Sequence, residues 1–391
     1  MNSILFDDKQ ITQLYPLTLT RPSAKLRCGI LTIAEKWEHH LQCIVSYQTL
    51  DYLSSKFPIL LEEDNHFING RCLPNEEIVS QIKGLEVGQA LYLHDTLIAY
   101  RGTHFDEALS ADKVQASSSC VLIGKVHNLF TFNHQEINND FSLLTKGRTS
   151  EAISKSNTVL GTHSIFIEPG AKVEASVLNV SEGPIYIGTE AEIMEGSLVR
   201  GPFALCEHAT LKMGAKIYNG TTVGPYCKVG GEVSNSILIG YSNKGHDGFL
   251  GNSVLGEWCN IGADSNTSNL KNNYEIVKLW NYDSERFEKT GTQFCGLFMG
   301  DHSKCGINTM FNTGTVVGVS ANIFGSGFPR NFIPSFSWGG AQGFDTYAST
   351  KAYQTAELVM QRRGITLTEN DKQILNHIYT LESKYRTWEK L

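Results

Sequence analysis

An apolar side chain returns at every sixth position in residues 187–229, IGTEAEIMEGSLVRGPFALCEHATLKMGAKIYNGTTVGPYCKV. This stretch carries the strongest indication of the fold. These positions hold Ile187, Ile193, Val199, Leu205, Leu211, Ile217, Val223 and Val229. The small or turn-forming residues between them are Gly188, Gly214, Gly220 and Gly224. A chain that turns a corner every few residues needs such positions, and a single coil cannot bury its apolar face alone. The repeat therefore predicts a stack of coils, a parallel β-helix.

The repeat continues along the chain with one interruption. It loosens over residues 231–249, tightens at SVLGEWCNIG (residues 253–262), and stops at SNLKNNYEIVKLWNYDSERFEKTG (residues 268–291), which we expect to project as a loop. It resumes from FCGLFMG to ANIFG and ends at residue 325. From Asp345 onward the apolar spacing becomes helical, which predicts a pair of terminal helices.

The residues before the repeat have a different pattern. SILFDD, residues 3–8, reads as a strand that delivers Asp7 and Asp8 to its carboxyl end. ILTIAEKWEHHL has helical spacing, and CIVSY and ALYLHDTLIAY are typical of buried strands. This mixture predicts an α/β domain. We expect three parts: an α/β domain over residues 1–145, the β-helix over 155–340, and terminal helices over 345–391.

Composition excludes several functional classes. The formal charge is -7 and the sequence pI is near 6.0, which argues against a nucleic-acid or anionic-membrane binder. The nine cysteines are odd in number and form no C-x-x-C pair, so we expect no disulfide framework and a reducing cytoplasm. The opening MNSILFDDKQ has acids where a signal peptide needs basic and apolar residues. No stretch reaches the roughly 18 apolar residues of a membrane span.

One histidine stands among glycines inside the repeat. In NKGHDGFLG, residues 243–251, His246 follows Gly245 and precedes Gly248. A lone histidine in a turn is commonly a solvated loop residue. An imidazole titrates close to neutral pH, however, so a positioned histidine can also act as a general base, worth roughly 10²- to 10⁴-fold in rate.

The run HDGFLGNSVLGEWCNIGADSNTSN, residues 246–269, favours the catalytic interpretation. It resembles the acetyltransferase half of the bifunctional N-acetylglucosamine-1-phosphate uridyltransferases. This resemblance implies a left-handed β-helix that forms a homotrimer with active sites between neighbouring subunits, and acetyl-CoA as the acyl donor. It further implies that His246 is the general base, that Asn260 binds the sugar phosphate, and that Asn269 and Ala263 contact the acyl donor. Phe249 stands where the family has a substrate-contacting tyrosine.

Other residues of the repeat have weaker assignments. Lys212, Lys216 and Lys244 are candidate sugar-phosphate ligands, although a solvated face is an equally good reading of surface lysines. The same type of solenoid also supports zinc enzymes, which need a close pair of histidines and a third one. The histidines of the repeat are isolated from one another in the sequence, so we expect no zinc site there.

The amino-terminal domain resembles the nucleotidyltransferase half of the same family. LYPLTLTRPSAKLR, residues 14–27, lies where the family has a glycine-rich loop with a T-R pair, and it lacks the glycines. The resemblance implies that Arg21, Lys25 and Arg27 bind the phosphates of UTP. LHDTLIA, residues 93–99, is similar to a G-D-x-P-L segment and implies Asp95 as a Mg²⁺ ligand, with Asp7 and Asp8 behind it. A surface ion-pair set is the alternative reading of these residues.

The whole chain before the terminal helices most resembles the compact bacterial sugar nucleotidyltransferases of this family. The first hypothesis is therefore a cytoplasmic sugar-nucleotide enzyme that acetylates an amino-sugar phosphate on the β-helix, with nucleotidyl transfer by the α/β domain. The second is a nucleotidyltransferase whose β-helix only assembles the trimer. The third is a non-catalytic protein that binds a nucleotide sugar.

Overall fold

The computed structural model describes residues 1–390 and separates the chain into two compact units. The first, which we call the α/β unit, comprises Met1–Leu14, Thr20–Leu26 and Leu31–Lys125. The second, the β-helix unit, comprises Tyr15–Leu19, Arg27–Ile30 and the chain from Val126 onward. The fold class predicted from the sequence, an α/β domain followed by a β-helix and helices, is confirmed.

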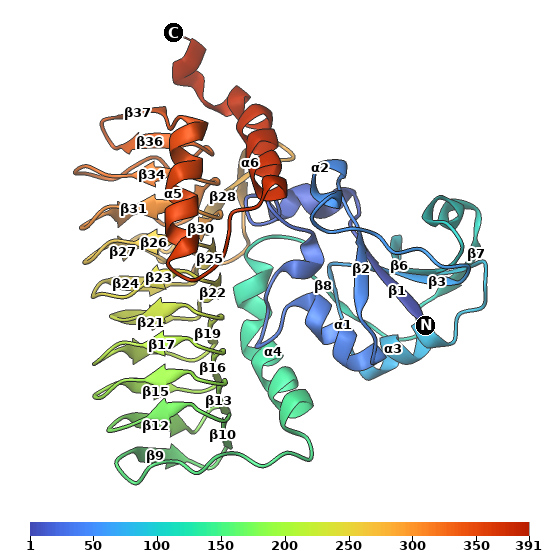
Figure 1. Cartoon of the computed structure of the whole chain (residues 1–391), viewed down its shortest axis with the longest axis horizontal. Coiled ribbons are helices and arrows are strands. Elements are labelled where there is room, and N and C mark those ends of the chain that lie inside the picture. Colours follow the sequence, from blue (N-terminus) through green and yellow to red (C-terminus); the bar gives the residue numbers. More distant parts are fainter. Residues whose placement is uncertain (391) are drawn as a thin grey trace. The chain divides into compact units, whose positions relative to one another are not determined.

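The α/β unit is built on a six-stranded sheet of order β2-β1-β3-β6-β5-β7. Strands β1, β2 and β3 run parallel, and β6 is antiparallel to both β3 and β5 (Figure 1). The strands are β1 (Asn2–Phe6), β2 (Val45–Gln48), β3 (Asn65–Asn69), β5 (Gln89–Leu93), β6 (Thr96–Gly102) and β7 (Asp112–Gln115). Because the carboxyl ends of parallel strands meet at one edge, the residues that follow β1, β2 and β3 lie together.

Three helices and a small second sheet complete this unit. The helices are α1 (Ile33–Leu41), α2 (Asp51–Ser54) and α3 (Glu76–Lys83), and the small sheet pairs β4 (Cys72–Leu73) with β8 (Val121–Leu122). Helix α1 begins with a capping box, in which the Thr32 side chain accepts from the Glu35 amide and the Glu35 carboxylate accepts from the Thr32 amide. Its buried Trp37 donates to the Cys72 carbonyl at 2.9 Å, which fixes the helix against β4.

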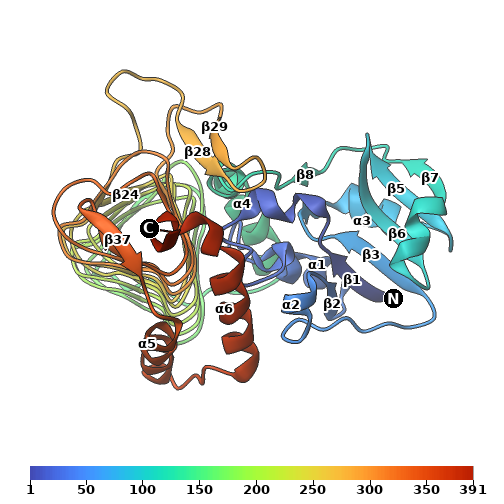
Figure 2. The same cartoon turned by 90° about the horizontal axis from the view of Figure 1, so that it is seen from above.

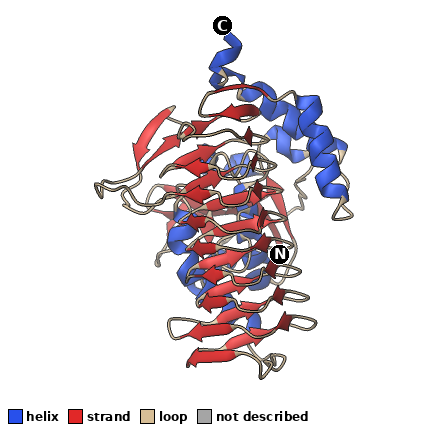
Figure 3. Ribbon diagram, turned by 90° about the vertical axis from the view of Figure 1, so that its left-hand side faces the viewer, coloured by secondary structure: helices blue, strands red, loops and turns tan. Residues whose placement is uncertain are grey.

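The β-helix unit stacks short parallel strands into three faces (Figure 3). The nine-stranded face is β10 (Ile165–Ile167), β13 (Ile185–Ile187), β16 (Phe203–Leu205), β19 (Thr221–Val223), β22 (Ile237–Gly240), β25 (Val254–Glu257), β30 (Leu297–Met299), β33 (Thr315–Val317) and β35 (Phe332–Ile333). The ten-stranded face is β11 (Lys172–Val173), β14 (Glu192–Ile193), β17 (Thr210–Leu211), β20 (Lys228–Val229), β23 (Asn243–Lys244), β26 (Asn260–Ile261), β31 (Lys304–Cys305), β34 (Asn322–Ile323), β36 (Ser337–Gly340) and β37 (Gly343–Thr346). The six-stranded face is β9 (Thr158–Gly161), β12 (Val177–Val180), β15 (Leu198–Arg200), β18 (Lys216–Ile217), β21 (Glu232–Ser234) and β24 (Phe249–Gly251), and β27 (Asn266–Thr267) pairs with β32 (Met310–Phe311).

The six-residue repeat explains the core. Each apolar residue of the repeat points inward and contacts its counterparts in the coils above and below, so one continuous core runs along the stack. All eight apolar residues predicted from residues 187–229 belong to this core. Since neighbouring coils pair in register, for example Leu205 with Val223 and Leu211 with Val229, outward residues also form columns.

Helix α4 (Asn128–Thr145), the last element of the α/β domain expected over residues 1–145, groups by its contacts with the β-helix unit. It lies along the nine-stranded face, against β16, β19 and β22 (Figure 1). The Asn133 amide donates to the Gly220 carbonyl at 2.7 Å and to Thr222 Oγ1 at 3.0 Å. The Asp140 carboxylate accepts from the Ile30 amide at 2.8 Å. These buried contacts hold α4 against the coils and against the segment 27–30 of the same unit.

The inserted segment is more ordered than the loop expected from the sequence. It forms a hairpin of β28 (Lys278–Asn281) and β29 (Arg286–Lys289), which Figure 2 shows projecting from the coils. The predicted terminal helices are α5 (Ser349–Gln361) and α6 (Glu369–Leu381). Among residues 1–390, no helix is both long and apolar enough to cross a membrane.

Candidate functional site

The ten-stranded face carries a cavity of about 650 Å³, which we call the β-helix pocket. It is lined by Lys212, Lys228, Tyr241, Asn243, Gly245, His246, Trp258, Cys259, Asn260, Ile261, Gly262, Ala263, Lys304, Ile307, Val359, Arg362 and Arg363. All of these residues belong to the β-helix unit.

One wall of the pocket is a column of outward residues on adjacent strands. Lys228 pairs in register with Asn243, Asn243 with Asn260, and Asn260 with Lys304. Because side chains alternate across a strand, these four point away from the core on the same face. Two residues after each of the last three comes a glycine, Gly245, Gly262 or Gly306. A Cβ built on Gly245 would meet no atom within 4 Å, so this glycine leaves open space at the floor of the pocket.

The structure brings four of the sequence-predicted residues together. His246 lies on the turn after β23, Asn260 lies on β26, and Ala263 lies on the turn of the next coil. Lys212, which follows β17, lines the same pocket. The spacing of His246, Asn260 and Ala263 thus places all three on consecutive coils of one face.

The other four predicted residues of the β-helix do not line the pocket. Lys216 and Phe249 lie on β18 and β24 of the six-stranded face. The Asn269 amide donates to Asn252 Oδ1 at 2.8 Å. Lys244 is buried, with 1% of its surface exposed, so it is not a ligand for a substrate phosphate.

Cations gather in the pocket without acidic partners. Lys212, Lys228, Lys304, Arg362 and Arg363 all line it, and none of the five forms an ion pair with a carboxylate within the part of the chain that the structure describes. Burial, and then the charges of Arg363, Lys212 and Arg362, lower the pKa of Lys228. Burial lowers the pKa of Lys304 to about 8. An unneutralised cluster of this kind is suited to a ligand that carries phosphate.

The two arginines come from the end of helix α5, and sequence reasoning missed them. Arg363 donates to the Tyr226 carbonyl at 3.3 Å, which holds the end of the helix against the coil that carries Lys228. The helical pattern predicted α5 itself. It gave no signal of which coil the helix end reaches, because that contact joins residues 137 positions apart.

A column of stacked rings borders the pocket. His208, Tyr226, Tyr241, Trp258 and His302 follow one another with ring centroids 4.6, 5.0, 4.3 and 6.3 Å apart. Each ring residue occupies the left-handed backbone region, with φ between 53° and 61°, at the same corner of its coil. Stacking between coils is a gain that offsets the strain of a non-glycine residue in this region.

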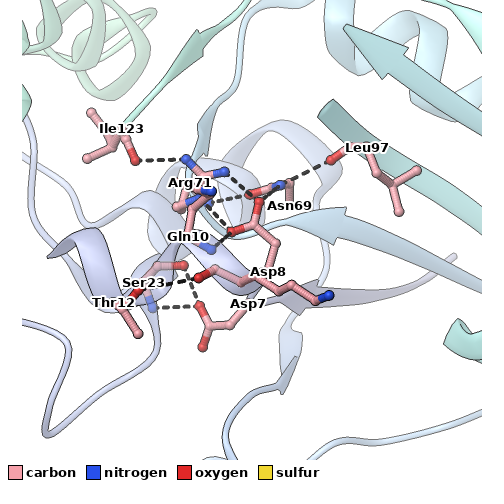
Figure 4. A network of polar contacts seen from close by, with 10 residues as sticks. Asp7, Asp8, Gln10, Thr12, Ser23, Asn69, Arg71, Leu97 and Ile123 are labelled. Carbon is pink, nitrogen blue, oxygen red and sulfur yellow. Dashed lines mark hydrogen bonds and ion pairs between the residues drawn. The ribbon is translucent and has the colours of Figure 1, made fainter. Parts of the chain in front are cut away.

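The α/β unit has a second polar centre at the carboxyl edge of its parallel strands (Figure 4). Asp8 accepts from Arg71 Nε at 2.9 Å, from Asn69 Nδ2 at 3.0 Å and from the Gln10 amide at 3.0 Å. Asp7 accepts from the Ser23 amide at 2.9 Å and from Thr49 Oγ1 at 2.6 Å. These residues follow β1, β2 and β3, as the parallel topology requires.

The pKa values of Asp7 and Asp8 are shifted in opposite directions. Burial raises the pKa of Asp7, against the lowering effect of its hydrogen bonds with Ser23 and Thr49. Burial acts on Asp8 in the same direction, but the hydrogen bonds and charge of Arg71, with Asn69 and Gln10, bring the pKa of Asp8 below its ordinary value. Asp8 is therefore an ionised anchor for Arg71.

Of the three predicted phosphate ligands, Arg21 and Lys25 lie in the α/β unit and Arg27 does not. Arg21 is buried, with 5% of its surface exposed, and Lys25 Nζ lies 5.1 Å from the centroid of the Tyr47 ring. Arg27 instead belongs to the β-helix unit, where its buried guanidinium donates to the carbonyls of Ile30 and Ile239. Arg27 therefore holds the backbone together and is not available to a nucleotide.

The predicted magnesium site is not assembled. Asp95 is exposed on the turn between β5 and β6, while Asp7 and Asp8 are occupied by the donors described above. Within residues 1–390, no group of three or more His, Cys, Asp or Glu is placed to hold a metal ion. The residues present do not fit a resident Mg²⁺ ion, and we derive no chemical step through one.

Comparisons with known proteins agree with the two-part organisation. Residues 3–149 match the family model described as sugar nucleotidyl transferase. Over 87 residues the chain is 37% identical to the bifunctional protein GlmU of Methanocaldococcus jannaschii, covering 22% of this chain and 21% of that protein. Over 145 residues it is 27% identical to a bifunctional sugar-1-phosphate nucleotidylyltransferase/acetyltransferase of Sulfurisphaera tokodaii, covering 37% and 36%. The resemblance predicted from the sequence is confirmed.

The chain is also similar to two further proteins. The bifunctional protein GlmU of Corynebacterium glutamicum is 31% identical over 166 residues, covering 40% of this chain and 30% of that protein. The solved structure of the polySia specific acetyltransferase NeuO is 14% identical with a TM-score of 0.28, covering 49% of this chain and 87% of that chain. The matches span between 21% and 36% of the length of the three curated relatives.

Proposed function

We propose that this chain is a transferase of sugar-nucleotide biosynthesis, and that its β-helix pocket moves an acetyl group from acetyl-CoA to the amino group of an amino-sugar 1-phosphate. One observation carries the proposal. His246, Asn260 and Ala263, three of the residues that the family resemblance singles out, line one cavity of about 650 Å³ together with five cations, whereas Asn269 and Phe249 do not line it. A volume of this size suits a small-molecule substrate.

In this reaction His246 removes a proton from the ammonium group of the sugar, and the freed nitrogen attacks the thioester carbonyl. A C–N bond forms and the C–S bond breaks, so that coenzyme A leaves as a thiolate and takes up a proton. Asn260 and the cations Lys212, Lys228, Arg362 and Arg363 bind phosphate groups. Guanidinium and ammonium groups recognise phosphate through charge-assisted hydrogen bonds.

The proposed assembly is a homotrimer in which a neighbouring copy completes each site. Lys216 and Phe249 lie on a different face from His246, so a second copy is needed to bring them to the sugar. Large apolar side chains are exposed next to the pocket, with Met213 72% and Ile307 69% exposed. Such side chains are expected to be covered when copies associate.

The test is release of coenzyme A thiol from acetyl-CoA in the presence of glucosamine 1-phosphate. We expect His246→Ala to lower the rate roughly 10²- to 10⁴-fold, because the base is lost while the pocket is kept. His163→Ala, which changes an exposed histidine outside the pocket, is the matched control. A folded wild-type protein that is no faster than His246→Ala overturns the proposal.

A second candidate function is nucleotidyl transfer to a sugar 1-phosphate by the α/β unit, and the family match over residues 3–149 favours it. Arg21 and Lys25 are the residues of this unit that we expect to hold phosphates, with UTP as the donor. The measurement is pyrophosphate release, which Arg21→Ala should abolish and His246→Ala should leave unchanged. Thermal stabilisation by UTP or a UDP-sugar without any turnover would indicate binding alone.

A further inference from the structure

A lysine occupies a core position of the coil that carries His246. On the ten-stranded face, successive coils each point one side chain into the core at the second position of the strand. These inward residues are Val173, Ile193, Leu211, Val229, Lys244, Ile261, Cys305 and Ile323. All except Lys244 belong to the continuous apolar core, and Lys244 is nevertheless as buried as they are.

The ammonium group of Lys244 is directed at the turn that follows it. Its Nζ donates to the carbonyl of His246 and, at 3.1 Å, to the carbonyl of Asp247. Burial lowers the pKa of Lys244 to about 8, and the nearby carboxylates of Asp247 and Asp264 oppose that effect. Lys244 thus binds the backbone of the turn from the inside, while the His246 side chain lies on the outside, in the pocket.

The turn around His246 has no hydroxyl at the position just before the next strand. This position holds Ser265 or Thr309 in two later coils, whose hydroxyls donate to the Gly306 carbonyl at 3.1 and 2.9 Å. It holds Gly231 in the preceding coil and Gly248 here. In this turn the side-chain donor to the backbone is Lys244, which reaches the carbonyls of His246 and Asp247.

Glycines let the turn lie close to the backbones of the two neighbouring coils. Gly245 faces open space, whereas a Cβ on Gly248, whose φ is +108°, would lie 2.1 Å from the Ser265 carbonyl oxygen. On the other side, a Cβ on Gly231 of the preceding coil would come within 2.7 Å of the His246 carbonyl oxygen. The amides of Asp264 and Glu232 donate to the carbonyls of Asp247 and Gly248, and Lys244 adds the contact at the His246 carbonyl itself.

We propose that Lys244 is a positioning residue, which fixes the backbone of His246 so that its imidazole faces the pocket in one orientation. The assignment of the imidazole as a base rests on the proposed function. The hydrogen bonds from Lys244 to the carbonyls of His246 and Asp247, which we call the Lys244 brace, do not depend on that assignment.

Energetics support a role other than stability. Burying an ammonium group is unfavourable even when it is hydrogen-bonded, and an apolar side chain of similar volume at such a position is often neutral or stabilising. The other coils have that apolar side chain. The lysine of this one coil is therefore not explained by the stability of the fold, and we expect its role in the turn that it contacts.

The experiment compares Lys244→Met, Lys244→Gln and the control Ile323→Met, which changes the equivalent inward residue of another coil. Amide hydrogen exchange of residues 245–248 is measured beside thermal unfolding and the acetyl-transfer rate. We expect Lys244→Met to fold, to exchange at least tenfold faster in the turn, and to lose about tenfold in kcat with little change in the KM for acetyl-CoA. Lys244→Gln, which keeps an amide donor, should fall between wild type and Lys244→Met. Ile323→Met should leave the turn and kcat unchanged.

Each outcome decides one question. Wild-type exchange and wild-type kcat in Lys244→Met overturn the proposal. If Lys244→Met does not fold, Lys244→Gln provides the same comparison. The proposal is then overturned if amide exchange in residues 245–248 and the pH profile of kcat are the same in Lys244→Gln and the wild type. If the wild-type protein transfers no acetyl group, the proposed function fails, whereas faster exchange in Lys244→Met still supports the brace.

Discussion

The carboxyl edge of the α/β unit and the β-helix pocket both gather charged side chains, but they use the charges differently. At the carboxyl edge, Arg71 and Asp8 neutralise each other, and amide and hydroxyl donors occupy the remaining carboxylate oxygens. In the pocket, five cations have no acidic partner within the described chain. A charge that is matched inside the chain maintains the fold, whereas an unmatched cluster is available to a ligand.

The largest expected effect comes from breaking the matched pair. Arg71→Ala should lower the free energy of unfolding of the α/β unit by about 3 kcal/mol, because it leaves a partly buried carboxylate without its partner. Arg71 is 5% exposed in this pair. Chemical denaturation measures the loss.

Arg101→Ala is the matched control. Arg101 binds Asp64 at 2.7 Å, but both side chains are more exposed than the Arg71 pair, so the expected cost is below about 1 kcal/mol. Equal losses in the two variants would contradict the interpretation of Asp8 as an anchor.

The same pair predicts an acid dependence. The pKa of Asp8 is lower in the folded protein than its ordinary value of 3.8, so the folded state binds fewer protons than the unfolded state near that pH. The contribution is present above pH 3.8 and is lost as the pH falls through the folded-state pKa. The wild type should therefore lose more stability in acid than Arg71→Ala does. Parallel acid curves for the two proteins would count against the pairing.

A smaller effect is expected from removing one unmatched charge. Arg362→Ala should raise the KM for the phosphate-bearing substrate about tenfold, because one charge-assisted hydrogen bond to the phosphate is lost. The melting temperature should stay the same. Steady-state kinetics at two salt concentrations measure this, since screening should weaken binding in the wild type more than in the variant. Arg330→Ala, an exposed arginine outside the pocket, should change neither quantity.

The smallest effect should come from a matched pair at the surface. Arg200 and Glu182 of the β-helix lie 3.4 Å apart and each is about half exposed. Arg200→Ala should change the free energy of unfolding by less than about 1 kcal/mol in thermal or chemical denaturation. A loss as large as that of Arg71→Ala would show that burial is not what separates the two kinds of pair.

The sequence predicted what is local and repeated. The apolar residues from Ile187 to Val229 predicted the β-helix because each coil repeats the same inward contact. Of the residues that the matched run predicted for one site, His246, Asn260 and Ala263 line the pocket and Asn269 does not. The repeat did not predict that Lys244 is buried. A lysine in an isolated sequence is expected at the surface, and only the register of the coils places this one in the core.

Contacts between distant segments were missed for a related reason. The packing of α4 against the β-helix includes the Asn133 amide, and the cation cluster depends on the end of α5 reaching the Tyr226 coil. Neither contact leaves a periodic signal in the sequence. Arg27 was predicted as a phosphate ligand from its place after the T-R pair, and tertiary contacts with Ile30 and Ile239 give it another role.

The interleaving of the two units along the chain has a practical consequence for dissecting the protein. Segments 15–19 and 27–30 belong to the β-helix unit although they precede nearly all of the α/β unit. A fragment that begins at residue 126 would lack the Gly29 and Ile30 amides that donate to Asn133 and Asp140, and those buried acceptors would lose their partners. We therefore expect such a fragment to be less stable than the same residues in the intact chain, and point substitution in the intact chain is the better way to assign each activity.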